Sequence, residues 1–222
     1  MLRFYYKKLS LYSRPVWIAL LEKQLSFQSI ELALNGDQWQ PEFLAINPFG
    51  RVPVLVDKDF AVFESLTILD YLEFQYPATA LLPTDIETLT TVRMIEMTTL
   101  HELIPAMLTL VRVTDDEGVI ERANQQIISM LNFLEKRLSD SLYIAGDRIS
   151  LAEVVAGSII PWLPLIDIDL SDYPRVELWS SRLMQRPTWQ ATQPDSEITQ
   201  DWLKRIQKLP KVRQRHWRQK RK

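Results

Sequence analysis

The stretch from Asn47 to Leu72 restricts the fold of this chain more than any other part of its sequence. It opens with turn residues and continues into a short apolar, β-branched run at 52–56, which is typical of a buried strand. A polar turn separates that run from a second apolar run at 60–63, so the two runs predict a β-hairpin. Glu64 and Ser65 then begin a predicted helix, whose free backbone N–H groups suit a carboxylate.

The residues before this stretch predict the rest of a sheet. A strand is expected at 2–6, and a helix is expected at 14–23 with Pro15 in its first turn, where proline is favoured. An alternating run at 27–34 predicts a second strand. Strand, helix and strand in this order make a βαβ unit with a parallel pair, and the hairpin completes a sheet of four strands.

The pattern changes after the first 76 residues, which we assign to one domain. Two prolines and little periodicity place an interdomain linker at 77–84. From 85 to 203 the apolar residues recur at helical spacings, which predicts an all-helical second domain.

Three helices of the second domain are predicted by apolar periodicity, at 97–111, 120–138 and 176–184. Pro105 should kink the first of them, because proline removes a backbone donor inside a helix. Ser150 and Glu153 have the spacing of a capping box, so a further helix is expected to begin there.

Composition excludes several kinds of site. The chain has no cysteine, so disulfides, thiolate metal sites and a cysteine nucleophile are excluded. Its two histidines, His101 and His216, are far apart in the sequence, so no metal site is expected. The N-terminus reads as a strand rather than a signal peptide, and no apolar run approaches twenty residues. We therefore expect a cytoplasmic protein without a membrane span.

Charge is concentrated at the C-terminal end. Residues 204–222 hold ten basic residues and no acidic one, whereas the preceding 203 residues hold 16 basic and 28 acidic residues. This basic tail lacks an amphipathic period and contains Pro210, which favours a solvated end without regular structure. The alternative is a contact between the tail and an anionic surface, such as acidic lipid, nucleic acid or an acidic partner subunit.

The organising stretch resembles the glutathione-binding half of the cytosolic glutathione transferases. The shared pattern is Asn-Pro-x-Gly-x-Val-Pro, an acidic hairpin turn and Glu-Ser at a helix start, and it runs here from Asn47 to Ser65. The resemblance implies an α/β N-terminal thioredoxin-like domain, in the order βαβ-ββα, and an all-α C-terminal helical domain. It also implies a cis bond between Val52 and Pro53. A second pattern, Gly-Asp-x-x-Ser-Leu-Ala-acid at 146–153, resembles a buried helix start in the same family, where Asp usually replaces Glu153.

The first βα loop carries the candidate catalytic hydroxyl. Ser10 stands four residues before Arg14, and this spacing resembles the serine-type classes of the family, such as theta and phi. In those classes a serine donates a hydrogen bond to the glutathione sulfur, so the resemblance implies that Ser10 is catalytic. Ser13 is the alternative serine, and either serine taken alone is a typical helix cap. Other classes of the family use a tyrosine at the end of the first strand. The further hydroxyl candidates are therefore Tyr5, Tyr6 and Tyr12.

The chemistry of such an enzyme requires a thiolate, because the thiolate and not the thiol is the nucleophile. A free thiol has a pKa of about 8.5, and lowering it by ~2 units takes ~2.7 kcal/mol of preferential stabilisation of the anion. A hydroxyl hydrogen bond to an anion contributes roughly 1.5–3 kcal/mol. A helix N-terminus adds roughly 0.3–1 kcal/mol. The two together suffice without a metal or a general base.

The resemblance also implies how glutathione, the co-substrate, is held. The backbone of Val52 would pair with the cysteinyl backbone, Glu64 would meet the γ-glutamyl ammonium, and Ser65 its carboxylate. The glycyl carboxylate would meet Gln38, with Gln40 as the alternative amide. The full set implied for glutathione is Gln38, Gln40, Arg51, Val52, Pro53, Glu64 and Ser65. The candidates for the electrophile site are Leu11, Tyr12, His101, Pro105 and Met107, although for His101 and Met107 a packed or exposed helix face is favoured over a place in the pocket.

The expected function is attack of the glutathione thiolate on a small hydrophobic electrophile, by conjugation or by reduction of an organic hydroperoxide, in a detoxifying role. The resemblance implies a homodimer. One rival is a non-catalytic module that binds glutathione or assembles with other proteins. A second rival is another glutathione-dependent enzyme, an isomerase or a dehalogenase, that uses the same thiolate.

Overall fold

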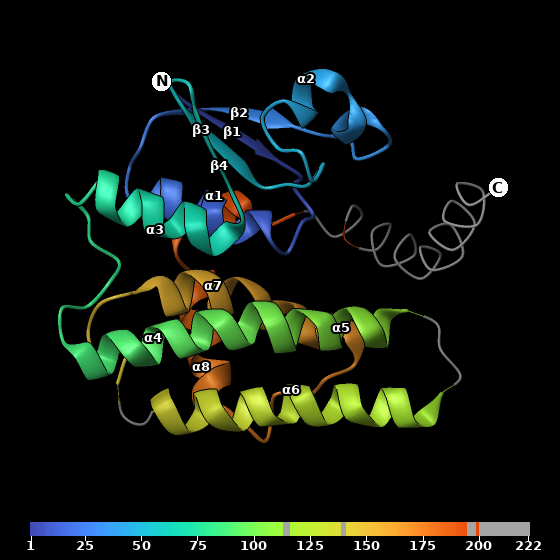
Figure 1. Ribbon diagram of the computed structural model, residues 1–222. Helices are drawn as coiled ribbons and strands as arrows, with labels where there is room; N and C mark the ends of the chain where they lie inside the picture. The colour runs from blue at the N-terminus through green and yellow to red at the C-terminus, as the bar shows by residue number, and fades with distance from the viewer. Residues whose placement is uncertain (113–115, 139–140, 195–198, 200–222) are drawn as a thin grey trace.

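The computed structural model describes residues 1–112, 116–138, 141–194 and 199 (Figure 1). A sheet lies at one end of the molecule and a helical domain at the other. Helices α1 (Ser13–Glu22) and α3 (Ser65–Gln75) lie between the sheet and the helical domain, and α2 (Pro41–Leu44) lies on the far side of the sheet. The predicted basic tail, 204–222, lies outside the described residues.

The sheet has four strands in the order β2-β1-β3-β4. Their bounds are β1 (Leu2–Tyr6), β2 (Phe27–Glu31), β3 (Val54–Asp57) and β4 (Phe60–Phe63). Strand β1 pairs in parallel with β2 and antiparallel with β3, and β3 and β4 form an antiparallel hairpin. The predicted βαβ unit, hairpin and thioredoxin-like arrangement are therefore confirmed.

Strand β2 is shorter than predicted, since it ends at Glu31 and not at Leu34. The carboxylate of Asp37 accepts hydrogen bonds from the backbone N–H of Ala33 at 2.6 Å and of Leu34 at 2.9 Å. Those two donors are consequently unavailable to a neighbouring strand. Leu34 also has a φ of 57°, which turns the chain away from the sheet.

The second domain is all-helical among the described residues. Its elements are α4 (Ile86–Thr98), a π-helical turn (Thr99–Leu103), α5 (Ile104–Val111), α6 (Glu117–Leu138), α7 (Leu151–Ile159), a 3-10 segment (Ile160–Ile166), α8 (Pro174–Met184) and α9 (Pro187–Thr192). Every residue of α7 is buried, and this helix lies between α1 and α4, against both of which it packs (Figure 1).

Pro105 changes the helix that contains it without ending it. The π-helical turn directly precedes α5, in which Pro105 is the second residue. The wider turn accommodates a proline that has no N–H and whose ring collides with the carbonyl four residues earlier. The continuous helix, Ile86–Val111, is long and apolar enough to cross a membrane by length and composition alone, a test that a buried core helix also passes. Half of its most apolar window is buried inside the protein, so the core accounts for these residues.

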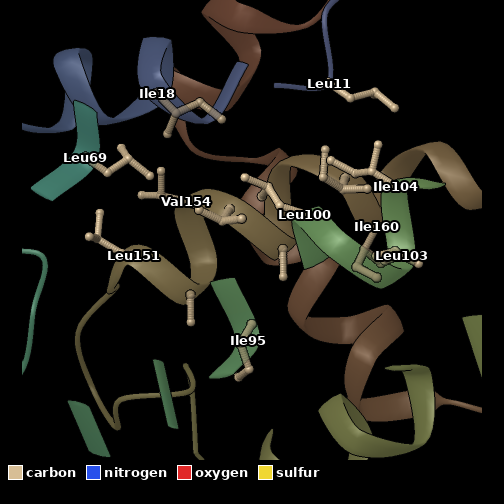
Figure 2. Close-up of a cluster of buried hydrophobic side chains, with 14 of the residues drawn as sticks. Leu11, Ile18, Leu69, Ile95, Leu100, Leu103, Ile104, Leu151, Val154 and Ile160 are labelled. Atoms are coloured by element: carbon tan, nitrogen blue, oxygen red, sulfur yellow. The ribbon is translucent and has the colours of Figure 1, made fainter. Parts of the chain in front are cut away.

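A single apolar core extends across both domains. Ile18 of α1 and Leu69 of α3 belong to the same buried cluster as Leu151 and Val154 of α7 (Figure 2). A smaller cluster around Phe43 lies on the other face of the sheet, beneath α2. Because the larger core is shared, the helical domain fixes the position of the helices that carry the predicted glutathione residues.

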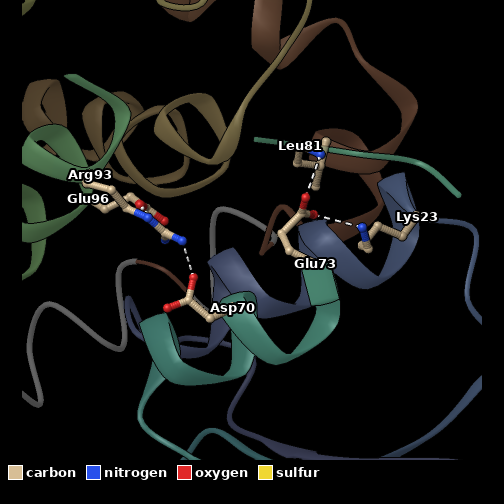
Figure 3. A network of polar contacts seen from close by, with 6 residues as sticks. All are labelled: Lys23, Asp70, Glu73, Leu81, Arg93 and Glu96. Carbon is tan, nitrogen blue, oxygen red and sulfur yellow. Dashed lines mark hydrogen bonds and ion pairs between the residues drawn. The ribbon is translucent and has the colours of Figure 1, made fainter. Parts of the chain in front are cut away.

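Buried polar contacts tie the segment between the domains to α3. The Lys23 ammonium binds the Glu73 carboxylate at 2.7 Å, and the other oxygen of that carboxylate accepts from the backbone N–H of Leu81 at 2.9 Å (Figure 3). The carbonyl of Leu81 in turn accepts from the N–H of Leu151, the first residue of α7. Both partners of the ion pair are almost fully buried, so removing either would leave a buried charge unpaired.

A second polar link joins α3 to α4. Arg93 binds Asp70 on α3 and the carboxylate of Glu96 at 2.9 Å (Figure 3). The carboxylates of Glu96 and Asp70 outweigh the effect of burial and raise the pKa of Arg93, which is one third exposed. Burial nevertheless raises the pKa of Glu96 to about 7, because this side chain has no contact with solvent and its Oε1 has no hydrogen-bond partner among the described residues.

The predicted capping box at the start of α7 is confirmed. The hydroxyl of Ser150 accepts from the backbone N–H of Ala152, and the carboxylate of Glu153 accepts from both the N–H and the hydroxyl of Ser150. The longer glutamate also accepts from the N–H of Ile144 at 2.7 Å and from the indole of Trp179 at 3.2 Å. Glu153 thus connects three segments of the helical domain.

Candidate active site

The loop between β1 and α1 is a tight turn followed by a helix start. The carbonyl of Ser10 accepts from the N–H groups of Ser13 and Arg14, at 3.0 and 3.1 Å. The Ser10 hydroxyl oxygen also accepts from the N–H of Ser13, at 3.1 Å. The half-buried Ser10 therefore uses its hydroxyl oxygen as an acceptor at the N-terminus of α1, which leaves the hydroxyl proton to donate to a ligand.

The alternative hydroxyls are less accessible or lie elsewhere. Ser13 is 1% exposed, and its hydroxyl accepts from the N–H of Lys7 at 3.5 Å. Tyr6 is 8% exposed and contacts Trp17 at a ring distance of 4.9 Å, so it is a core residue whose pKa burial raises. Tyr5 packs on the opposite face of the sheet, against Phe43. Tyr12 is partly buried and remains beside Ser10.

Arg14 is a buried side chain with a structural role between the two domains. It is 1% exposed, and burial lowers its pKa to about 10. Its guanidinium donates to the carbonyl of Ser158 at 2.9 Å, to Gln193 at 2.7 Å and to Thr192 at 3.5 Å. These contacts join α1 to α7 and to the C-terminal end of α9, so Arg14 holds the first loop against the helical domain.

The bond between Val52 and Pro53 is cis, as the resemblance implied. The strand expected from residue 52 begins at Val54 instead, and the pairing of β3 with β1 also ends at Val54. Pro53 has no N–H to continue the ladder. The side chain of Asn47 holds the preceding loop by donating to the carbonyl of Arg51 at 2.8 Å. The backbone of Val52 therefore lies beyond the sheet ladder, where an extended peptide backbone can pair with it.

The start of α3 is joined directly to the first loop. The hydroxyl of Ser65 donates to the carbonyl of Tyr12 at 2.8 Å, which brings the N-termini of α1 and α3 together. A carboxylate at this point would therefore be bound by the backbone N–H groups of α3, because the hydroxyl proton of Ser65 is already used. Glu64 is exposed and has a φ of 69°, a backbone conformation that non-glycine residues seldom adopt.

The segment predicted for the glycyl end of glutathione lies next to the loop that carries Arg51. The Trp39 ring covers Gly50 so closely that a Cβ at residue 50 would lie 2.5 Å from it, and Gly50 has a φ of 58°. Gln38 is partly buried, and its side-chain oxygen accepts from the N–H of Gly36 at 3.1 Å, which leaves its NH₂ group as a donor. Gln40 is exposed.

Tyr12 lies among charges from both domains. Burial raises the pKa of the Tyr12 phenol, the charges of Arg112 and Arg51 oppose that effect, and the charge of Glu64 adds to it. Arg112 directly follows α5 and was not among the residues predicted from the sequence. Its only sequence signal was a cation after the last apolar position of a helix, and a cation there is common at helix C-termini.

The structure separates the five electrophile-site candidates. Leu11 is buried in the same core cluster as Ile104 of α5, and Figure 2 shows the two in one region. Met107 is buried in that cluster as well. His101 and Pro105 are exposed. Only Tyr12 combines partial exposure with a place beside Ser10, so the set predicted from the sequence does not share one environment.

Among the described residues, no group of three or more His, Asp or Glu side chains could hold a metal ion. The candidate site consists of hydroxyls, backbone N–H groups, side-chain amides, arginines and the Glu64 carboxylate.

Two family profiles cover most of the chain. Residues 9–75 match the glutathione S-transferase N-terminal domain, and residues 87–187 match the glutathione S-transferase C-terminal domain.

Individual relatives agree with the profiles. Glutathione S-transferase F10 of Arabidopsis thaliana is 33% identical over 192 residues, which cover 80% of this chain and 89% of the relative. The crystal structure of a Sulfitobacter glutathione transferase homologue with bound glutathione has a TM-score of 0.73 at 25% identity, over 86% of this chain and 96% of that one.

The crystal structure of a maleylacetoacetate isomerase from Methylobacterium extorquens, with bound malonate and glutathione, has a TM-score of 0.73 at 28% identity. It covers 86% of this chain and 98% of that one. With both domain profiles matched and the Arabidopsis relative aligned over 80% of this chain, the protein belongs to the glutathione S-transferase family.

Proposed function

We propose that the protein ionises glutathione at Ser10 and directs the thiolate to a small electrophile. One observation carries the proposal: the hydrogen bond from Ser65 to the carbonyl of Tyr12 joins the N-termini of α1 and α3 beside the Ser10 hydroxyl. Two positive helix ends and a free hydroxyl proton then face the same region. An anionic sulfur and an α-carboxylate, both present in glutathione, suit this arrangement.

The energies are adequate for the chemistry. Depressing the pKa of a thiol by ~2 units requires ~2.7 kcal/mol. The Ser10 hydroxyl would supply roughly 1.5–3 kcal/mol as a hydrogen bond to an anion. The N-terminus of α1 would add roughly 0.3–1 kcal/mol. A thiolate formed this way attacks an electrophilic carbon in conjugation, or the peroxide oxygen of an organic hydroperoxide.

The remaining groups would orient glutathione. The backbone of Val52 pairs with the cysteinyl backbone next to the cis bond, and the N–H groups of α3 bind the γ-glutamyl carboxylate. Glu64 pairs with the γ-glutamyl ammonium. Arg51, with Gln38 or Gln40, binds the glycyl carboxylate, and the packing of Trp39 on Gly50 supports this by bringing the two loops together.

Steady-state kinetics with glutathione and a panel of activated aryl chlorides and hydroperoxides test the proposal. We expect saturable turnover that falls at least ~10-fold in Ser10→Ala, by the loss of one charged hydrogen bond. Ser13→Ala is the matched control and should keep most of the activity. Binding of glutathione without turnover of any panel member would instead support the non-catalytic module.

A glutathione-dependent isomerase is the second candidate, because one of the structural neighbours is named a maleylacetoacetate isomerase and holds malonate with glutathione. Addition and later release of the same thiolate would isomerise a double bond without consuming glutathione. Turnover that leaves the glutathione concentration unchanged distinguishes this candidate from conjugation.

We propose that the protein forms a homodimer through the exposed side of α4. A groove there is lined by Thr90, Arg93, Met94, Met97, Thr98 and Phe133. Met94 and Met97 are 40% and 50% exposed, which is unusual for neighbouring methionines on a monomer surface. Sedimentation should give a dimer for the natural chain and a monomer for Met94→Glu with Met97→Glu, and a monomeric natural chain would contradict the proposal.

A cytoplasmic location and a contact of the tail 204–222 with an anionic surface stay predictions from the sequence. Cell fractionation tests the first. Deletion of 211–222, followed by retention on anionic vesicles and on DNA, tests the second, and unchanged retention on both would remove it.

A further inference from the structure

Arg112 directly follows α5, the helix whose Ile104 shares a buried cluster with Leu11 of the first loop. Its backbone N–H donates to the carbonyl of Leu108, and the chain then leaves α5 in an extended conformation. The side chain is partly buried. Its Nε is buried and has no hydrogen-bond partner among the described residues. A buried donor without a partner is costly, so such a group in a native protein calls for an explanation.

The neighbourhood of Arg112 indicates the missing partner. Its charge acts on the Tyr12 phenol, together with the charges of Arg51 and Glu64. Among the described residues no hydrogen bond engages the Tyr12 hydroxyl, whereas the Tyr12 carbonyl accepts a hydrogen bond from Ser65. The charges of two arginines and one glutamate therefore act on a phenol two residues from Ser10 in the first loop. This excess of positive charge suits an anionic ligand.

Glutathione accounts for two of these three charges. In the proposed function Glu64 pairs with the γ-glutamyl ammonium, and Arg51 with the glycyl carboxylate. Arg112 comes from the helical domain, which carries none of the residues assigned to glutathione. Arg112 is the cation that remains for a second substrate bound beside the thiolate.

We propose that Arg112, with the hydroxyl of Tyr12, binds a carboxylate on the second substrate, so that this enzyme prefers electrophiles that carry a carboxylate group. The proposal rests on the proposed function. Arginine suits the task because its planar guanidinium binds a carboxylate through two parallel hydrogen bonds. The Nε is one of the donors that such a paired contact uses.

A matched pair of electrophiles tests this inference: 4-chloro-3,5-dinitrobenzoate and its neutral methyl ester. Both lose chloride to the glutathione thiolate, and they differ in the carboxylate. The variants are Arg112→Gln and Arg112→Lys, with Arg148→Gln as the control at an exposed arginine. Each kcat/KM is compared with that of the natural chain on the same electrophile, which cancels the different intrinsic reactivities.

We expect Arg112→Gln to lose roughly 10- to 100-fold in kcat/KM for the benzoate, which corresponds to one charged hydrogen-bonded contact. The ester and the KM for glutathione should stay within about twofold by the same reasoning. Arg112→Lys should recover part of the loss, because lysine restores the charge but cannot form the two parallel hydrogen bonds of a guanidinium.

Three results would overturn the inference. Equal losses on the benzoate and the ester would make Arg112 a structural residue. A raised KM for glutathione would assign it to the co-substrate. Unchanged kinetics on the benzoate would mean that the protein itself neutralises Arg112. Turnover of the ester by the natural chain keeps the proposed function separate from all three, because it needs the thiolate alone.

Discussion

Arg14 in α1 and Arg112 after α5 both have buried guanidinium nitrogens, and the protein treats them in opposite ways. Arg14, at the boundary between the domains, is 1% exposed and donates to Ser158, Thr192 and Gln193. Arg112, beside Tyr12, has a buried Nε without a hydrogen-bond partner among the described residues. The first guanidinium is satisfied within the fold, and the second is available to a ligand.

The buried glutamates repeat this difference away from the site. Glu153 is buried with hydrogen bonds to both of its carboxylate oxygens, from Ile144, Ser150 and Trp179. Glu96 is equally buried, but its Oε1 has no partner among the described residues. Burial raises the pKa of both carboxyls, and their hydrogen bonds oppose that effect. The two glutamates therefore differ in how many of their oxygens have partners, and not in the direction of the pKa shift.

The largest expected effect is the loss of the satisfied arginine. Arg14→Leu should lower the free energy of unfolding by roughly 3 kcal/mol or more, because three acceptors lose a charged donor inside the core. Urea denaturation at neutral pH measures the change. Arg148→Leu at an exposed arginine is the control. A loss in Arg14→Leu below about 1 kcal/mol would mean that the boundary does not depend on this guanidinium.

The next effect is a pH dependence caused by Glu96. Its pKa is raised from 4.5 to about 7 in the folded protein. A raised folded pKa favours the protonated native state, so the contribution of this group to stability is complete below pH 4.5 and is lost as the pH rises through about 7. The loss amounts to roughly 3 kcal/mol.

Glu96→Gln should remove that dependence, because an amide keeps the shape of the side chain and does not ionise. Denaturation curves across this pH range should show the natural chain losing stability relative to the variant as the pH rises. Parallel profiles for the two proteins would show that Glu96 ionises normally in the folded state.

The smallest expected effect is on the stability of Arg112→Gln. Removing a guanidinium that has an unsatisfied buried donor should change the free energy of unfolding by less than about 0.5 kcal/mol. The same denaturation experiment measures it beside Arg14→Leu. A loss comparable to that of Arg14→Leu would remove the distinction between the two arginines, and with it the main support for a ligand at Arg112.

Local signals explain what could be predicted from the sequence. The strand at 2–6 and the capping box of Ser150 and Glu153 depend on contacts within a few residues, and both were found. The end of β2 was wrong by three residues, because the side chain of Asp37 captures two backbone donors. Periodicity does not record such a contact.

The candidate site was predictable where a motif encodes backbone geometry. The cis bond at Pro53 and the helix start at Ser65 followed from the pattern. The spacing to Arg14 favoured Ser10 over Ser13 but could not tell which hydroxyl the fold buries, and the structure buries Ser13 and leaves Ser10 half-buried. Arg112 was missed because it lies one hundred positions after Tyr12 in the sequence. Its effect on the Tyr12 phenol arises only when the two domains pack together.

The ionisation of bound glutathione tests the central claim most directly. The ultraviolet absorbance of the thiolate is titrated against pH for the natural chain, Ser10→Ala and Ser13→Ala. We predict that the natural chain and Ser13→Ala depress the pKa of the bound thiol by ~2 units from its free value of about 8.5, and that Ser10→Ala restores most of the difference. A thiol pKa that stays depressed in Ser10→Ala, or that is never depressed in the natural chain, would contradict the account.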